Sequence, residues 1–259
     1  MSCDIEPEFE VPKAAAGGKT SCRACPLRAL PIFENQNAEQ LAFIETFKIG
    51  EMSIDAGAPI YLEGANSPFL YTVLEGWAFR FNSLADGRRQ ILNFALPGDF
   101  IGMQNAISDT MAHGIEALTE MRLCMFSRDK LFSLYVEHPS LGFDLTWLAA
   151  REERFLDDNL LAVGRRTARE KIAYLIAQLF ARARELDLVR NGTLHLPMTQ
   201  QHLADTLGLS LVHLNKTLRK LRTAGLVAFD GRMMMVKDEA VLRALAKIEA
   251  PARERRPLI

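Results

Sequence analysis

The chain has 259 residues, 49% of them hydrophobic, which is enough for one large domain or two smaller ones. Its formal net charge of −1 gives no sign of a nucleic-acid partner. No apolar run approaches the roughly 18 residues of a membrane span, and residues 1–18 lack a signal-peptide core. We therefore expect a cytoplasmic protein without a membrane partner, whose four cysteines indicate metal, redox chemistry or burial rather than disulfides.

The charges are unevenly distributed along the chain. Residues 160–259 contain 18 Lys and Arg against 9 Asp and Glu, whereas the preceding residues contain 13 against 23. This asymmetry indicates a basic DNA-binding module joined to an acidic module that does not bind DNA.

Residues 1–21 are acidic and then rich in Ala and Gly, and we expect a disordered tail. A Cys22-x-x-Cys25 pair and a short helical stretch over residues 39–47 follow. From Gly50, glycine turns separate short β-favouring runs, and Asp86-Gly87 is typical of a hairpin turn. Residues 22–138 are therefore predicted to form a cysteine-bearing segment and a β-roll or jelly-roll sensor domain within an α+β chain.

Residues 139–164 show helical spacing. Steps of four and three residues give a heptad seam, which predicts a dimer interface, although a plain core helix is the alternative. The seam positions are Leu141, Leu145, Leu148, Glu152, Phe155 and Asn159. The carboxylates of Glu152, Asp157 and Asp158 are expected to oppose dimerisation by like-charge repulsion.

Residues 165–248 are predicted to form a winged helix-turn-helix domain, followed by a tail over residues 249–259. Within residues 199–226 a first helix ends at Gly208, and Ser210 caps a second helix. Residues 226–236 form a wing around an Asp230-Gly231 turn. The polar face of the second helix is basic, which favours entry into the major groove of duplex DNA over a generic helical hairpin with a solvated face.

The ordered set of roll, long helix and winged helix-turn-helix resembles the Crp/Fnr family of bacterial transcription regulators. Residues 87–102 resemble its central roll hairpin and Pro-Gly-Asp-x-x-Gly turn, and residues 166–176 its hinge and first DNA-domain helix. The resemblance implies a homodimer on a pseudo-palindromic promoter site and RNA polymerase as a partner. No Ser/His/Asp triad, phosphate loop or HExxH motif indicates an enzyme, and a β-roll signalling module with another effector is disfavoured by the winged helix.

The family resemblance does not by itself identify the signal that the sensor domain detects, because different branches of the family bind different ligands. Cyclic-AMP-binding members carry Gly-Glu-Leu and then an Arg-Ser pair, whereas this chain has Gly102-Met103-Gln104 and neither Arg nor Ser in residues 109–113. Because a buried phosphate needs a donor, cyclic AMP is not expected as the ligand.

The cysteines instead resemble those of the Fnr branch, which holds an oxygen-labile iron–sulfur cluster. Cys22, Cys25 and Cys124 match three of its ligands, but Pro31 replaces the third cysteine of the amino-terminal run. The fourth ligand would then be Cys3 or a group from outside the chain. The resemblance thus implies an oxygen or redox response. A thiol switch, a buried structural cysteine, and an unidentified small ligand without any cluster remain alternatives.

The recognition helix departs from the Fnr pattern Glu-x-x-Ser-Arg, because the matching residues are Val212, Asn215 and Lys216. Lys216 can donate to guanine, Asn215 can pair with adenine, and Val212 can pack on a thymine methyl but cannot accept from cytosine. We therefore expect an operator changed beneath Val212. The remaining DNA-contact candidates, mostly for phosphates, are Thr199, Gln200, Ser210, His213, Arg219 and Lys220.

Overall fold

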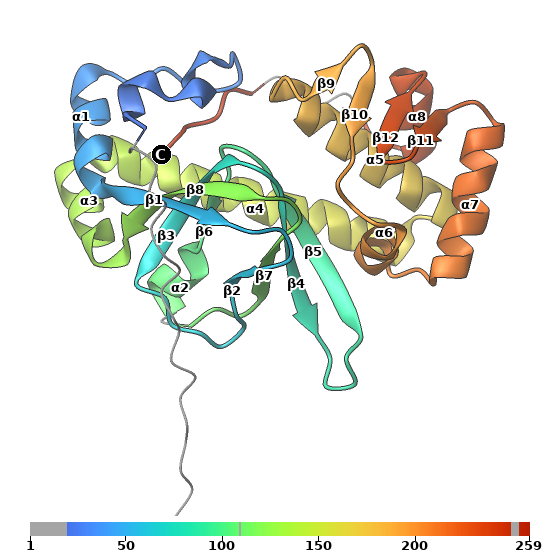
Figure 1. Cartoon of the computed structure of the whole chain (residues 1–259), viewed down its shortest axis with the longest axis horizontal. Coiled ribbons are helices and arrows are strands. Elements are labelled where there is room, and N and C mark those ends of the chain that lie inside the picture. Colours follow the sequence, from blue (N-terminus) through green and yellow to red (C-terminus); the bar gives the residue numbers. More distant parts are fainter. Residues whose placement is uncertain (1–19, 109, 250–253) are drawn as a thin grey trace, which may run out of the picture.

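The computed structural model describes residues 20–108, 110–249 and 254–259. Residues 1–19, which include Cys3 and most of the predicted amino-terminal tail, lie outside the described residues. The predicted α+β architecture is confirmed: a β-roll, a long helix and a helix-turn-helix domain follow one another along the chain (Figure 1). No helix in the described ranges has the length and apolar character that crossing a membrane requires.

The sensor half contains two four-stranded antiparallel sheets, with strand orders β1-β8-β3-β6 and β2-β7-β4-β5. The strands are β1 Lys48–Ile54, β2 Pro59–Tyr61, β3 Phe69–Glu75, β4 Ala78–Ser83, β5 Arg89–Ala95, β6 Phe100–Ile101, β7 Gly114–Ala117 and β8 Met121–Ser127. Buried side chains from both sheets, including Met52, Tyr61, Tyr71 and Ile115, pack together in the roll. This core holds the two sheets together.

Short helical elements precede and follow the strands of the roll in the sequence, and one of them, α2, lies between β6 and β7. They are η1 Cys22–Ala24, η2 Pro26–Ala29, α1 Ala38–Phe47, α2 Met103–Ser108, η3 Arg128–Lys130 and α3 Leu131–Glu137. Asn37 caps α1 and Gln40 completes its capping box. Gly98, with φ +84°, turns the chain between β5 and β6, and a Cβ atom there would collide with the Phe33 ring. That turn places the carboxylate of Asp99 inside the molecule.

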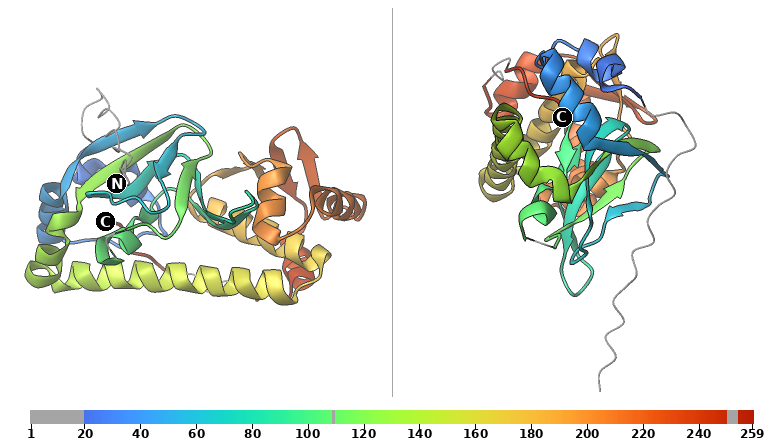
Figure 2. Two further views of the ribbon diagram at one scale, coloured as in Figure 1. Left: turned by 90° about the horizontal axis from the view of Figure 1, so that it is seen from below. Right: turned by 90° about the vertical axis from the view of Figure 1, so that its left-hand side faces the viewer.

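The long helix α4 (Pro139–Arg165) runs beneath both halves of the molecule, as the left view of Figure 2 shows. Leu141 and Leu145 are fully buried within the single chain, and Leu148 is 8% exposed. These leucines are core residues, so the prediction that they form a dimer seam is wrong. Spacings of three and four residues occur in any helix with one apolar face, whether that face meets a partner or its own domain.

The polar seam positions also face the chain's own domains. Glu152 accepts hydrogen bonds from Arg80 and from Asn93 Nδ2, the latter at 3.1 Å, and Asn159 Nδ2 donates to the Leu92 carbonyl at 2.7 Å. Phe155 is half-buried and packs against two guanidinium groups. Glu152 is thus paired with Arg80 inside its own chain, and the predicted repulsion between protomers stays a prediction.

The DNA-binding half begins at α5 (Ala168–Glu185), which Thr167 and Glu170 open with a capping box. It continues through β9 Val189–Arg190, β10 Thr193–His195, α6 Gln200–Leu207, α7 Leu211–Thr223, β11 Val227–Asp230, β12 Met233–Val236 and α8 Glu239–Ala246. Its four strands form one sheet of order β11-β12-β10-β9. Helix α6 lies against β5 of the roll, where Arg89 Nη2 approaches Asp205 Oδ2 to 3.2 Å.

Residues 254–259 return from the DNA-binding half to the sensor half, where Figure 2 marks the carboxyl terminus. Phe33 and Arg256 form an isolated parallel β-bridge, and Arg256, Leu258 and Ile259 are all buried. The predicted tail over residues 249–259 is thus in part an ordered segment. Residues 250–253 lie outside the described ranges.

Candidate DNA interface and sensor cavities

Helices α6 and α7 form the helix-turn-helix, and their caps set its geometry. The Thr199 hydroxyl accepts from the His202 amide at 3.2 Å to open α6, which ends at Gly208 in the left-handed conformation, φ +60°. The Ser210 hydroxyl accepts from the His213 amide at 3.3 Å to open α7. Ser210 therefore has a structural part as a helix cap in addition to its proposed contact with DNA.

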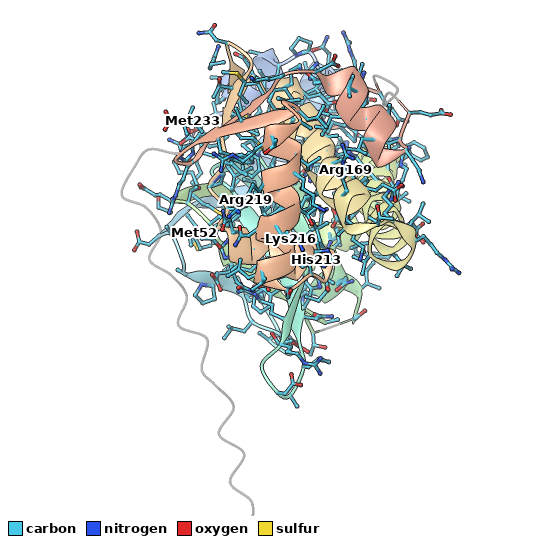
Figure 3. All side chains as sticks on the ribbon, turned by 90° about the vertical axis from the view of Figure 1, so that its right-hand side faces the viewer. Met52, Arg169, His213, Lys216, Arg219 and Met233 are labelled. Atoms are coloured by element: carbon cyan, nitrogen blue, oxygen red, sulfur yellow. The ribbon has the colours of Figure 1, made fainter. Side chains whose placement is uncertain are left out.

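Helix α7 is divided between a buried and an exposed face. Leu214 and Leu221 are fully buried and Leu218 is 5% exposed, whereas Val212 is 78% exposed. The predicted contact residues His213, Lys216, Arg219 and Lys220 are exposed, and Asn215 is half-buried. In Figure 3, His213, Lys216 and Arg219 follow one another along the side of α7 that faces away from the molecule. This arrangement leaves a continuous row of donors free to meet DNA.

An open groove of about 480 Å³ adjoins the end of α7 and the wing. Its walls include Arg219, Arg222, Phe229 of β11 and Lys237, which follows β12. Lys237 was not among the residues predicted from the sequence, because its place beside α7 depends on the fold of the wing. The cations in this groove extend the basic surface beyond the predicted recognition residues.

The three described cysteines line one small cavity. Cys22 lies in η1, Cys25 precedes η2, and Cys124 lies in β8, yet all three line a cavity of about 20 Å³. Burial raises the pKa of Cys22, and it raises the pKa of Cys124 to about 11 although Lys48 acts in the opposite direction. Both groups are therefore thiols near neutral pH in this arrangement.

This cavity does not fit an iron–sulfur cluster as it stands. Its volume is comparable to the space for one water molecule. Leu258, Ile259 and Arg28 occupy the wall beside the three cysteines. Among the described residues, no group of three His, Cys, Asp or Glu side chains is arranged to hold a metal ion. A cubane cluster needs four ligands, and Cys3 lies outside the described ranges.

A second, larger cavity of about 290 Å³ lies between the roll and α4. Arg80 Nε donates to His113 Nε2 at 3.0 Å, and the same guanidinium forms an ion pair with Glu152. Burial lowers the pKa of His113 to about 3, and the positive charge of Arg80 adds to the effect. The charge of Arg80 in this cavity wall is therefore already balanced by Glu152.

Comparisons with known proteins agree with this arrangement. Residues 51–138 match the cyclic nucleotide-binding domain family, and residues 170–245 match the Crp-like helix-turn-helix domain family. The transcriptional activator protein FnrL of Cereibacter sphaeroides is 33% identical over 225 residues, which are 85% of this chain and 90% of that protein. The nitrogen fixation regulation protein FixK of Bradyrhizobium diazoefficiens is 33% identical over 227 residues, or 87% and 93% of the two chains.

Among solved structures, FixK2 from Bradyrhizobium japonicum superposes with a TM-score of 0.70 at 29% identity, covering 78% of this chain and 98% of that chain. The relatives are transcription regulators and not enzymes, in agreement with the absence of a catalytic motif in the sequence. A cyclic-nucleotide-binding-type roll, an exposed basic recognition helix and these relatives together show that the chain belongs to the Crp/Fnr family of DNA-binding transcription regulators.

Proposed function

We propose that the protein binds a pseudo-palindromic promoter site as a homodimer and responds to oxygen or redox state. The observation that carries the DNA part is the division of α7, which buries Leu214, Leu218 and Leu221 and exposes Val212 and Lys216. One such helix per protomer enters one major groove in each half-site. Because its partner is DNA, we expect the protein to act in the bacterial cytoplasm. RNA polymerase is the further partner expected if the protein is an activator.

Base recognition is assigned to the first turns of α7. Lys216 is proposed to donate to guanine, half-buried Asn215 to pair with adenine, and Val212 to pack on a thymine methyl. Thr199, Gln200, Ser210, His213, Arg219 and Lys220 would hold the phosphates and fix the register. Arg222 and Lys237 in the groove beside the wing join this set.

The dimer is proposed to form through the outward face of α4 instead of the buried seam. Leu160 is 72% exposed and Leu161 is 51% exposed near the carboxyl end of the helix, and Phe143 is 70% exposed near its start. Large apolar side chains exposed along one helix suit a self-complementary two-fold interface. That interface would place the two α7 helices on one side of the dimer for two successive major grooves.

The redox part of the proposal rests on the meeting of Cys22, Cys25 and Cys124 at one cavity. Its test is DNA affinity measured with and without air, combined with iron and sulfide assays after anaerobic purification. Cys25→Ser and Cys124→Ser are the control variants. If the unchanged protein contains iron and sulfide and both serine variants lack them, the response belongs to a cluster. The cysteine cavity would then have to be more open than in this structure in order to hold that cluster. A response to air without iron would assign it to the thiols themselves.

A different small ligand is the second candidate, and the 290 Å³ cavity between the roll and α4 favours it. Arg80, His113 and Glu152 would supply its polar contacts. DNA affinity that is unchanged by air and by both serine variants would contradict the redox proposal and leave this candidate.

A further inference from the structure

We propose that the sensor domain contains a peptide-binding groove whose ligand is the chain's own carboxyl-terminal segment, residues 254–259. The inference does not depend on the proposed response to oxygen, because it concerns what closes the cysteine cavity. The last helix, α8, ends at Ala246 in the DNA-binding half, yet the segment lies against elements before and inside the roll. Its buried contacts run from Arg256 to Ile259.

The backbone of the segment pairs with the loop before α1. The Arg256 amide donates to the Ile32 carbonyl at 2.8 Å, and the Glu34 amide donates to the Arg256 carbonyl at 2.9 Å. These two bonds flank Phe33 and make the parallel bridge. Adding an extended segment to exposed backbone groups is a common way in which proteins bind peptides.

The side chain of Arg256 is the polar anchor. Its Nη1 atom lies 2.6 Å from Asp99 Oδ1, its Nη2 donates to the Pro97 carbonyl at 3.0 Å, and its guanidinium carbon is 4.6 Å from the centre of the Phe33 ring. The residue is only 3% exposed. Neighbouring Arg255 is exposed and provides a natural control. An arginine is buried in this way only when its charge is paired, so the groove is selective for a cation at this position.

The last two residues fill the apolar end of the groove. Leu258 and Ile259 are 2% and 4% exposed and line the cysteine cavity. The Leu258 carbonyl accepts from Gln36 Nε2 at 2.8 Å and from Arg28 Nη2 at 3.3 Å, and the Thr72 hydroxyl donates to the Ile259 carbonyl oxygen. The groove thus recognises an arginine, two large apolar side chains and the backbone carbonyls that carry them.

This occupancy explains why the cysteine cavity is small. The side chains of Leu258 and Ile259 stand in the wall that Cys22, Cys25 and Cys124 share. When the segment leaves, the cavity gains their volume and the buried thiols gain access to solvent. The segment therefore closes the cysteine cavity reversibly. When it dissociates from the groove, Asp99 also loses its ion pair with Arg256.

The test uses thiol labelling by an aromatic disulfide reagent in a background of Cys3→Ser and Cys25→Ser, so that only Cys22 and Cys124 react. Removal of residues 254–259 is expected to speed labelling by about tenfold or more, because these thiols otherwise react only when the groove opens locally. A synthetic peptide with the sequence of residues 254–259 should restore protection when added to the truncated protein. The same peptide with alanine in place of Arg256 should not.

Full-length Arg256→Ala and Arg255→Ala give the matched comparison. The first should label faster than the unchanged background and the second at the same rate. A folded truncated protein whose thiols stay as protected as before overturns the proposal, and so does fast labelling that the peptide does not slow. If the truncated chain lacks a cooperative thermal transition, equal labelling of the two full-length variants overturns it.

Discussion

Arg182 of α5 and Asp99 of the β5–β6 turn form a buried ion pair, with 2.6 Å between Nη2 and Oδ2. The pair joins the first helix of the DNA-binding half to the sensor half. Arg256 of the carboxyl-terminal segment and Arg151 of α4 lie 2.6 and 3.3 Å from the other oxygen of the same carboxylate. Burial by itself would raise the pKa of Asp99, but Arg182, Arg256 and Arg151 outweigh it and hold the pKa well below its ordinary value.

Replacing Asp99 by asparagine should destabilise the protein by about 3–5 kcal/mol, because it leaves buried guanidinium groups without a countercharge. The acid dependence should change as well. A carboxylate whose pKa is depressed in the folded state adds stability above its ordinary pKa of about 4, and this contribution is lost as the pH falls below that value. Urea unfolding at several pH values measures both effects.

The control for this prediction is Asp86→Asn, which removes an exposed carboxylate paired with Arg88 in the β4–β5 hairpin. It should leave the urea midpoint at neutral pH almost unchanged. Equal midpoints for the two asparagine variants would mean that Asp99 does not hold the two halves together.

His113 should make the protein less stable as the pH falls from about 6.5 toward 3. Its pKa is lowered to about 3 in the folded state, whereas the unfolded chain takes up a proton near the ordinary value of 6.5. Over this window the unfolded state binds more protons, so the loss is at most about 1.4 kcal/mol per pH unit. His113→Gln keeps an acceptor for Arg80 but does not titrate, and it should flatten the pH dependence of the urea midpoint.

His195, an exposed residue of β10, offers the comparison for this variant. His195→Gln should follow the unchanged protein through the whole pH range. Parallel curves for His113→Gln and the unchanged protein would show that His113 does not contribute to the acid loss.

The contacts of α7 should separate into base-reading and phosphate-binding classes. Lys216→Ala is expected to weaken binding to the selected operator by about tenfold or more and to relax its sequence preference. Arg219→Ala should weaken binding to every duplex and reduce the slope of log affinity against log salt by about 1 for each protomer. Fluorescence anisotropy at several salt concentrations gives both values. Exposed Lys130, which lies in the sensor half, should be replaceable by alanine without either effect.

The outward face of α4 should control dimerisation. Leu160→Asp is expected to raise the dimer dissociation constant at least about tenfold in sedimentation experiments while the fold is kept. Leu145→Asp, at a position that is fully buried in one chain, should instead unfold the sensor half. Ile107→Asp places the same charge on an exposed apolar residue of α2 and should leave the dimer intact. A dimer that survives Leu160→Asp would exclude this face as the interface.

The sequence predicted the architecture because each part has a strong local pattern. The caps at Thr199 and Ser210, the turn at Gly208 and the apolar spacing of α7 are all visible in residues 199–226. The sequence did not show which surface the apolar face of α4 packs against. The spacing that placed Leu141 and Leu145 on one face is equally compatible with a partner helix and with the chain's own roll.

The carboxyl-terminal segment left no such signal. Arg256 lies among charged residues in the segment that was predicted to be a tail, and its partner Asp99 is 157 residues away along the chain. The gathering of Cys22, Cys25 and Cys124 followed from the family resemblance, but the small size of their cavity did not. It depends on Leu258 and Ile259, whose burial only the folded chain shows.

The most direct test of the central claim is selection of binding sites from random duplex DNA, performed in parallel with the unchanged protein and with Val212→Glu. The account predicts that both proteins enrich a pseudo-palindrome, and that the two sites differ at one base pair in each half-site. Glutamate should restore a preference for cytosine there, since it can accept from the cytosine amino group and valine cannot. Enrichment of no sequence, or of the same site by both proteins, would contradict the account.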